Sequence, residues 1–388
     1  MKCWAETIGG CSKISKERLI SKSTFHNDSG YKPGIIRGYG LPWNENKLIE
    51  ILKFVSPGTP IREGIDNILM AGNGAIIVIG DTPEVMMVVN GGFYVNSEFT
   101  PQRLTELSKL DGAIIIDSEI KKILFCNTLL APDSTIKTNE TGTRHQAAER
   151  TAKQTGKLVI AISERRKIIA LYFEDIKYIL KPVDELLNRA NESLGILEKN
   201  KEIFDEFLLN LNLLEFTNSV TMGDFAFLVQ RAEILQRIAF IIGRYITELG
   251  KEGNLIKIQL KEIMKNFEKE KFLVLRDYCK DFNFSRRALL TLSIDELIEI
   301  DNVLTCLLYN NLDKNVAPKG LRLLNKTLLS HEEIEALVKN FKFNRLLELV
   351  ESGDLKKILE VIPEISGRES VLKALLELKK QALLSKKI

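Results

Sequence analysis

The sequence predicts a mixed α/β domain followed by an all-helical region, and two patterns predict that order. Before Pro182, short apolar runs bounded by glycine alternate with segments whose apolar residues recur every three or four positions. After Pro182, the helical spacing continues for most of the remaining chain. Strands that are apolar throughout are buried on both faces, so we expect a mixed sheet sandwiched by helices and then a helical bundle.

The composition is that of an ordinary globular protein of two or three domains. The chain has 388 residues, 45% hydrophobic and 28% charged, and its net charge of +3 is too small to indicate nucleic-acid binding by itself. None of the five cysteines forms a Cys-x-x-Cys pair, which argues against zinc and against a disulfide framework. No apolar run approaches a membrane span. We therefore expect a cytoplasmic protein with reduced thiols and no membrane partner.

The N-terminal part is predicted to contain an arm and then the α/β domain. Residues 1–44 show no periodicity, are rich in Ser, Lys and Gly, and predict a flexible or loosely docked arm. A helical face begins at Asn46 and stops at residues 56–59, after which Pro60 opens the next helix. A third helix opens at Thr100. The predicted strands cover residues 74–80, 85–89, 114–116, 123–125, 158–162 and 168–173.

Two boundaries divide the chain into three domains. Pro182 ends an α/β domain over residues 45–182, and the stretch 315–320 separates a helical domain over 183–316 from a small domain over 317–388. The helices predicted after Pro182 cover residues 183–197, 204–211, 225–249, 255–269, 289–309, 321–329, 331–339, 345–351, 355–362 and 368–380.

The segment 138–150 contains the strongest signal for a binding site. A turn leads into a helix that Gly156 closes, with Thr143 as the predicted N-cap. Arg144 and His145 then lie in the first helical turn, where the helix dipole already places partial positive charge. Cations there are unfavourable unless an anion binds, so this pattern indicates a phosphate site. The alternative is a surface helix with two solvated basic residues.

A second signal lies at the start of the strand predicted at residues 114–116. Asp111 and Gly112 place a carboxylate and a bare backbone at the edge of the sheet. That arrangement suits a metal ion and a closely packed planar base, although Asp-Gly is also a common turn. A dinucleotide fold is disfavoured because no strand leads into Gly-x-Gly-x-x-Gly, and a P-loop is disfavoured because Gly-x-x-x-x-Gly-Lys-Ser/Thr is absent.

Together the two stretches resemble the diadenylate cyclase family, whose signature pairs Asp-Gly-Ala with Arg-His-Arg. Here the first motif is Asp111 to Ala113 and the second begins at Arg144 and His145. The resemblance runs from about Asn46 to the C-terminus and is weak in the last third. Further matching stretches are residues 56–59, 91–93, 131–133, 148–150 and 153–157.

The resemblance implies a reaction, a metal and partners. Two ATP molecules would condense to cyclic di-AMP with release of two pyrophosphates, assisted by Mg²⁺ or Mn²⁺. One site binds one ATP, so two sites must face each other in a dimer, and the branch of the family most similar to this chain assembles such dimers into an octamer. In that branch the last domain is a helix-hairpin-helix module that binds DNA. Here residues 317–388 depart from that module, because the expected Gly-hydrophobic-Gly turn at residues 361–367 keeps only Gly367.

The resemblance also implies residue roles. Asp111, Arg144 and His145 would be catalytic, and Asp111 would bind the metal and help to deprotonate the ribose hydroxyl. Gly112 would let the backbone lie against the nucleotide, and Leu130 would pack on adenine or offer it backbone groups, with plain core as the alternative. The full set implied for ATP binding is Asp111, Gly112, Ala113, Leu130, Thr143, Arg144, His145 and Ser163, with Arg165 or Arg166 as charge support unless that turn is simply exposed.

One position departs from the family motif. The third residue of Arg-His-Arg is Gln146 here, and an amide cannot replace a bidentate guanidinium. The sequence therefore predicts an active but altered cyclase. The alternatives are an ATP-binding sensor that has lost synthesis and a DNA-binding scaffold whose α/β domain mainly oligomerises.

Overall fold

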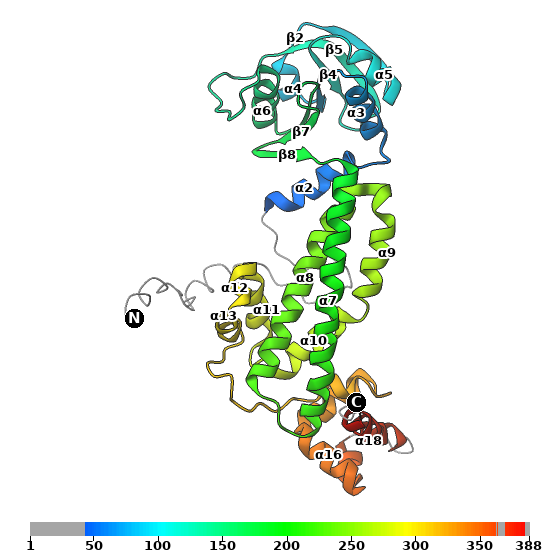
Figure 1. Cartoon of the computed structure of the whole chain (residues 1–388), viewed down its shortest axis with the longest axis vertical. Helices are drawn as coiled ribbons and strands as arrows, with labels where there is room; N and C mark the ends of the chain where they lie inside the picture. The colour runs from blue at the N-terminus through cyan, green and yellow to red at the C-terminus, as the bar shows by residue number, and fades with distance from the viewer. Residues whose placement is uncertain (1–42, 362, 364–368, 385–388) are drawn as a thin grey trace, which may run out of the picture. The chain divides into compact units, whose positions relative to one another are not determined.

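The computed structural model describes residues 43–361, 363 and 369–384, shown in colour in Figure 1. The arm predicted at residues 1–44 lies outside this part except for its last two residues, which open α2 (Trp43–Phe54). The chain divides into two compact units. The first contains the described residues up to 192 together with 242–258, and the second contains 193–241 and the described residues from 259 onward.

The first unit is built on one mixed sheet, as the sequence predicts, and this sheet has eight strands. Its order is β2-β5-β4-β1-β6-β7-β8, and β3 also pairs with β5. β1 and β4 run parallel, and every other neighbouring pair is antiparallel. The strands are β1 (Ala75–Ile79), β2 (Val89–Asn90), β3 (Phe93–Glu98), β4 (Ala113–Ile116), β5 (Lys122–Leu130), β6 (Leu158–Ser163), β7 (Ile168–Phe173) and β8 (Ile176–Leu180).

Helices cover both faces of this sheet, which is why its central strands are apolar throughout. On one face, α2, α3 (Pro60–Met70) and α5 (Pro101–Leu107) contribute side chains to a core that includes Ile77 of β1. On the other face, α4 (Pro83–Val88) and α6 (Thr143–Thr155) contribute side chains to a core that includes Ile76 and Val78. The predicted starts of α3 and α5 are confirmed, because Thr59 and Thr100 are N-caps whose hydroxyls accept backbone N–H groups.

Two local expectations are wrong, and the strands β3 and β8 are missing from the prediction. The strand predicted at residues 85–89 is the helix α4, in which Val85 and Val88 lie three positions apart on the buried face, and only Val89 enters β2. The edge strand β3 and the final strand β8 alternate in burial, so neither is the continuous apolar run on which the prediction relied. Thr143 is the first helical residue of α6, and Gly142 is its N-cap.

The helices after Pro182 agree with the predicted all-helical region. The segment predicted as one helix at 255–269 is two, separated by Asn266 in the left-handed conformation. The segment 289–309 is divided by the capping box of Ser293 and Glu296. The helices are α7 (Val183–Phe216), α8 (Met222–Leu249), α9 (Asn254–Ile263), α10 (Phe267–Tyr278), α11 (Phe282–Thr291), α12 (Ile294–Ile298) and α13 (Ile300–Cys306), with a 3₁₀ turn at Gly250–Gly253.

The C-terminal helices share a core with the helical region before them. Phe216 of α7 and Leu273 of α10 lie in one buried cluster with Leu321, Phe343 and Leu372. The separate domain predicted at 317–388 stays a prediction, and most of the 361–367 turn lies outside the described residues. The helices are α14 (Leu321–Leu324), α15 (His331–Asn340), α16 (Phe343–Ser352), α17 (Lys356–Val361) and α18 (Glu369–Leu384).

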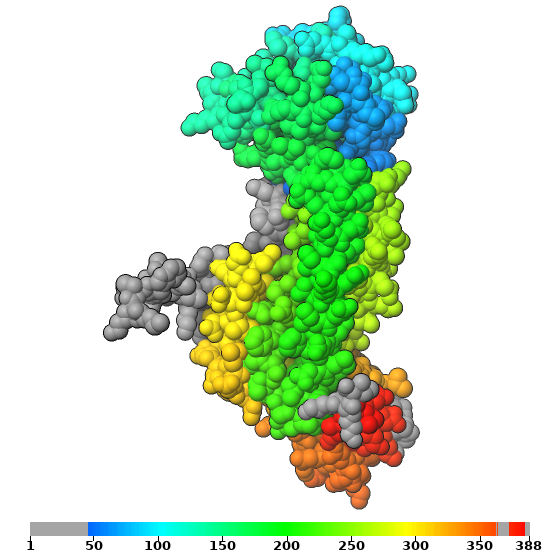
Figure 2. Space-filling view, in the orientation of Figure 1, coloured from blue at the N-terminus to red at the C-terminus, as the bar shows by residue number. Residues whose placement is uncertain are grey.

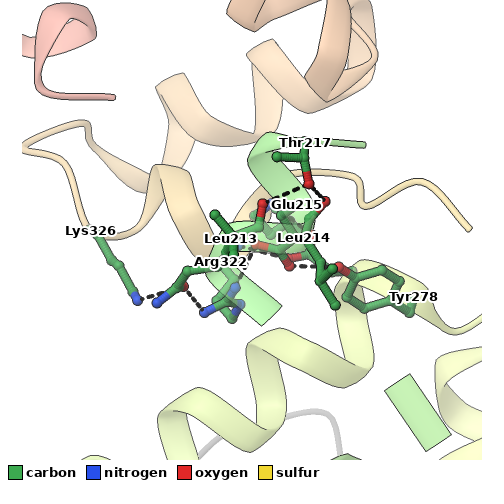
Figure 3. A network of polar contacts seen from close by, with 10 residues as sticks. Leu213, Leu214, Glu215, Thr217, Tyr278, Arg322 and Lys326 are labelled. Atoms are coloured by element: carbon green, nitrogen blue, oxygen red, sulfur yellow. Dashed lines mark hydrogen bonds and ion pairs between the residues drawn. The ribbon is translucent and has the colours of Figure 1, made fainter. Parts of the chain in front are cut away.

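A buried polar network joins three of these helices (Figure 3). Arg322 of α14 forms an ion pair with Glu215 of α7, and both side chains are almost completely buried. Tyr278 of α10 donates its hydroxyl hydrogen to Glu215. Asp277 accepts the backbone N–H groups of Leu321 and Arg322 at 2.7 and 2.9 Å. This network fixes the start of α14 against the helical region.

Among the described residues, no helix is long and apolar enough to span a membrane.

Candidate functional site

The topology of the sheet brings the predicted site residues to the same end of its strands, which is called one edge of the sheet here. β1 and β4 are parallel, so Gly74, directly before β1, and Asp111, two residues before β4, lie at the same edge. β6 is antiparallel to β1 and β5 is antiparallel to β4, so Ser163 and Leu130 end their strands at that edge too. α6 packs against β6 and β7, with its N-terminal turn nearby.

Asp111 and Arg144 meet at this edge. The Asp111 side chain is 95% exposed, and Arg144 Nη2 lies 3.6 Å from its Oδ1 atom. The backbone N–H of Gly112 donates to the same carboxylate at 3.1 Å. Gly74 makes room for the guanidinium, because a Cβ atom there would overlap Arg144. The two predicted motifs therefore contact each other through a carboxylate and a guanidinium that are both accessible to solvent.

Gly112 is required by the sheet itself. Its φ is +93°, and a Cβ atom would lie 2.7 Å from the backbone oxygen of Thr128 in β5. Thr128 in turn donates its hydroxyl hydrogen to the backbone oxygen of Ala113. The expected reason for this glycine was a close approach to a nucleotide, whereas the close approach found here is to the neighbouring strand.

The first turn of α6 presents Thr143 and Arg144 and buries His145. Thr143 is exposed, Arg144 is half-buried, and His145 is only 5% exposed. Of the two basic residues at this helix N-terminus, Arg144 is thus accessible to solvent and His145 is buried.

His145 belongs to a buried chain of hydrogen bonds. Its Nδ1 atom lies 2.9 Å from the Tyr172 hydroxyl oxygen, and Tyr172 donates its hydrogen to Glu140 Oε1 at 2.7 Å. Lys177 of β8 forms an ion pair with the same carboxylate. His145 Nε2 is buried and has no hydrogen-bond partner among the described residues.

The charges in this chain follow from burial and from these contacts. Burial alone would raise the pKa of Glu140, but hydrogen bonds from Lys177 and Tyr172 outweigh it and hold that pKa below its usual range. Burial, followed by the hydrogen bond to Glu140, raises the pKa of Tyr172, so the phenol keeps its proton. Burial, followed by the positive charge of Arg166, lowers the pKa of His145 and favours the neutral ring.

The remaining predicted residues are placed less directly. The Leu130 side chain is buried in the core between the sheet and α6, so it is core and only its backbone could serve a base. Ser163 Oγ accepts the backbone N–H of Arg166 at 3.3 Å and thereby holds the β6–β7 turn. Arg165 and Arg166 are exposed in that turn, and Arg166 acts electrostatically on His145.

Gln146 and four other side chains of α6 hold the segment 131–142, called the β5–α6 loop here. This loop lies at the surface of the first unit (Figure 2). Positions 146, 149, 150, 153 and 154 share one helical face. Gln146 Nε2 donates to the backbone oxygen of Glu140 at 2.8 Å, Arg150 to that of Ile136 and Lys153 to that of Lys137. The other two contacts are Thr138 to Glu149 and the Asp133 N–H to Gln154.

A metal ion at this site would have one protein carboxylate. Among the described residues no three His, Cys, Asp or Glu side chains are grouped to hold a metal. The exposed Asp111 carboxylate fits a hard divalent cation, since Mg²⁺ commonly binds one or two carboxylates and completes its shell with water and substrate phosphates.

Four supporting residues were not predicted. Gly74 was seen only as a boundary of the first strand, although its position before a strand parallel to that of Asp111 was a usable signal. Glu140, Tyr172 and Lys177 gave no signal, because a Tyr or Lys in a strand is common and their contacts span 27 or more residues.

Comparisons with known proteins agree with this fold. A family model described as DisA bacterial checkpoint controller nucleotide-binding matches residues 62–176, and one described as the DisA linker region matches residues 180–316. The DNA integrity scanning protein DisA of Clostridium acetobutylicum is 42% identical over 351 residues, 89% of this chain and 98% of that protein. Its counterpart in Clostridium kluyveri is 43% identical over 352 residues, 88% of this chain and 98% of that protein.

The fold and the family models together define a nucleotide-binding α/β domain of the diadenylate cyclase type, which a helical linker region follows in the sequence. The chain belongs to the family of the DNA integrity scanning protein DisA. The fold class and the resemblance predicted from the sequence are both confirmed.

Proposed function

We propose that the chain condenses two ATP molecules into cyclic di-AMP and releases two pyrophosphates. The observation that supports this most is the meeting of Asp111 and Arg144 at the edge where β1 and β4 begin. A carboxylate and a guanidinium 3.6 Å apart, both exposed to solvent at least in part, can each take a new partner. The carboxylate can bind a metal ion, and the guanidinium can bind a phosphate.

The 3′-hydroxyl of one ATP attacks the α-phosphate of the other and displaces its pyrophosphate, and the reverse attack displaces the second pyrophosphate and closes the ring. Catalysis of such a transfer rests on positioning and on stabilising charge. Mg²⁺ or Mn²⁺ bound through Asp111 supplies a Lewis acid for the phosphates. Asp111 also accepts the hydroxyl proton, while Thr143, Arg144 and His145 hold the β- and γ-phosphates.

Other residues shape the nucleotide site. The backbone of Gly112 and Ala113 lies beside the base, and Ser163 bonds the triphosphate with a hydroxyl hydrogen that its own turn leaves free to donate. For Leu130 we propose only backbone contacts to adenine, because its side chain is buried.

Each site binds one ATP, so the reaction requires two chains whose sites face each other. We propose such a dimer, and an octamer of facing dimers by analogy with the family. Light scattering of the purified protein tests this, and a monomer that remains active would exclude it.

The test of activity is incubation of the full-length protein with ATP and either metal, followed by chromatography. Asp111→Asn should abolish cyclic di-AMP. The matched control is Asp175→Asn, the same change in an exposed turn between β7 and β8 at the opposite edge of the sheet. No product from the parent protein, or equal product from Asp111→Asn, contradicts the proposal.

An ATP-binding sensor without synthesis is the second candidate, and Gln146 favours it. The Gln146 amide is occupied with the backbone of Glu140, so it supports the loop and offers no charge to phosphate. Bound ATP that is recovered intact, together with product formation by Gln146→Arg, would select this candidate.

We also propose that DNA binding regulates the protein through residues 317–388. The support is the name of the relatives, DNA integrity scanning protein. Fluorescence anisotropy with duplex and four-way-junction DNA across a salt series tests it, because phosphate contacts weaken steeply with salt. Absence of binding at low salt rules out this regulation and also excludes the alternative of a DNA-binding scaffold.

A further inference from the structure

The hydrogen-bond chain behind His145 fixes which ring nitrogen carries the proton. Glu140 is ionised, so its carboxylate only accepts hydrogen bonds. Tyr172 has one hydroxyl hydrogen and donates it to Glu140 at 2.7 Å. The Tyr172 oxygen can then only accept, so His145 Nδ1, 2.9 Å away, must be the donor.

The other ring nitrogen is consequently left open. With the proton on Nδ1, the neutral ring carries its lone pair on Nε2. That atom is buried, and no described residue pairs with it. An unpartnered polar atom on a ring that is 5% exposed is unfavourable, which indicates that a ligand normally satisfies it.

We propose that Tyr172, held by Glu140 and Lys177, is a positioning residue that keeps the His145 proton on Nδ1 and offers Nε2 to a phosphate group of the bound nucleotide. Binding of that phosphate then brings a proton to Nε2, because an oxyanion requires a donor. This inference rests on the proposed nucleotide site and adds the partner that sets the state of His145.

The charged groups around His145 make protonation of its ring depend on whether a ligand is bound. Arg144 lies on its own helix, Arg166 in the β6–β7 turn and Lys177 on β8, and all three disfavour an imidazolium. Glu140 of the loop favours it, but three cations oppose one anion. A triphosphate would reverse that balance, so proton uptake should accompany its binding.

Tyr178 provides a matched control on the neighbouring strand. It pairs with Leu171, one residue before Tyr172, and donates its hydroxyl to Glu248 at 2.7 Å. Tyr172→Phe and Tyr178→Phe thus each remove one tyrosine-to-glutamate hydrogen bond from the same sheet, buried for Tyr172 and partly buried for Tyr178. Only the first change removes the partner of His145.

Solid-state ¹⁵N NMR of the full-length protein reads the tautomer directly. The chain has three histidines, so replacing His26 and His331 by Gln leaves His145 as the single labelled ring. We expect Nδ1–H and an unprotonated Nε2 in that background and in Tyr178→Phe, and a mixture of tautomers in Tyr172→Phe. Identical spectra for the two variants would overturn the inference, whether or not the protein makes cyclic di-AMP.

Ligand binding is then followed with 3′-deoxy-ATP and Mg²⁺, which present the triphosphate but lack the attacking hydroxyl. We expect Nε2 to become protonated at saturation. We expect affinity to fall about 10- to 100-fold in Tyr172→Phe, by analogy with the loss of the outer partner of a metal-ligating histidine. Glu140→Gln keeps an acceptor for Tyr172 and should lose less. Saturation without protonation of Nε2 refutes the phosphate contact, and failure to bind the analogue refutes the nucleotide site as well.

Discussion

Removing Glu215 should destabilise the second unit strongly, because it leaves a buried cation without its counterion. Arg322 is fully buried and has two side-chain partners, Glu215 and Asn212, while its Nε atom has none among the described residues. In Glu215→Leu the guanidinium retains one neutral acceptor, and Tyr278 loses the acceptor of its hydroxyl.

The magnitude follows from what remains unpaired. Breaking a buried ion pair from one side costs about 3–5 kcal/mol, since the orphaned charge cannot return to water. Replacing both charges, Glu215→Leu with Arg322→Met, removes that penalty. The double variant should then lose only about 1–2 kcal/mol, mainly from the unsatisfied Tyr278 hydroxyl.

Hydrogen exchange followed by mass spectrometry measures this where it occurs. Peptides from α14 and α16 should exchange faster in Glu215→Leu and recover much of their protection in the double variant. Peptides from β6 and β7, in the other unit, serve as the internal reference. If the double variant is as unprotected as the single one, an orphaned charge is not the cause and the reasoning fails.

Three further predictions concern other sites. Burial, followed by the charge of Glu215, raises the pKa of Asp277 to about 7. The contribution of Asp277 to stability is therefore present below about pH 4 and is lost as pH rises through 7. Asp277→Asn should flatten this part of the curve of stability against pH, and an unchanged curve contradicts the prediction. Gly112→Ala should lower the free energy of unfolding by about 2–4 kcal/mol, because of backbone strain and overlap with β5. Gly91→Ala, also at positive φ but in open space, should lower it by about 1–2 kcal/mol. Equal losses in denaturant unfolding would exclude overlap as the cause. Arg150→Ala should speed hydrogen exchange and proteolysis in the β5–α6 loop with little change in global unfolding, and an equally protected loop would show that this bond does not hold it.

The sequence predicts the frame of this protein well where burial is simple. β1 is recognisable because both of its faces are buried, which makes it a continuous apolar run that glycines bound in the sequence. α3 is recognisable because Thr59 and Pro60 mark its start. α4 was mistaken for a strand because Val85 to Val89 are mostly β-branched or flexible apolar residues, and a six-residue helix is too short to show a period. Packing against α6 decides its form.

The site was predictable only in its chemical core. Asp111 and Arg144 carry signals in local sequence, a carboxylate before a strand and a cation at a helix start, and the structure brings them together. Which nitrogen of His145 is free depends on Tyr172, which is 27 residues away and on another strand. Such a partner is chosen by the register of the sheet, and the sequence carries no local trace of it.

The β5–α6 loop is held mainly through its main chain, since four of its five ties to α6 end on backbone atoms. Its shape is therefore set by α6 and by the contacts of Glu140 with Tyr172 and Lys177, while α6 holds residues 136 and 137 through their backbone oxygens alone. A library that randomises residues 134–137 should preserve the contour of the loop and alter what it displays.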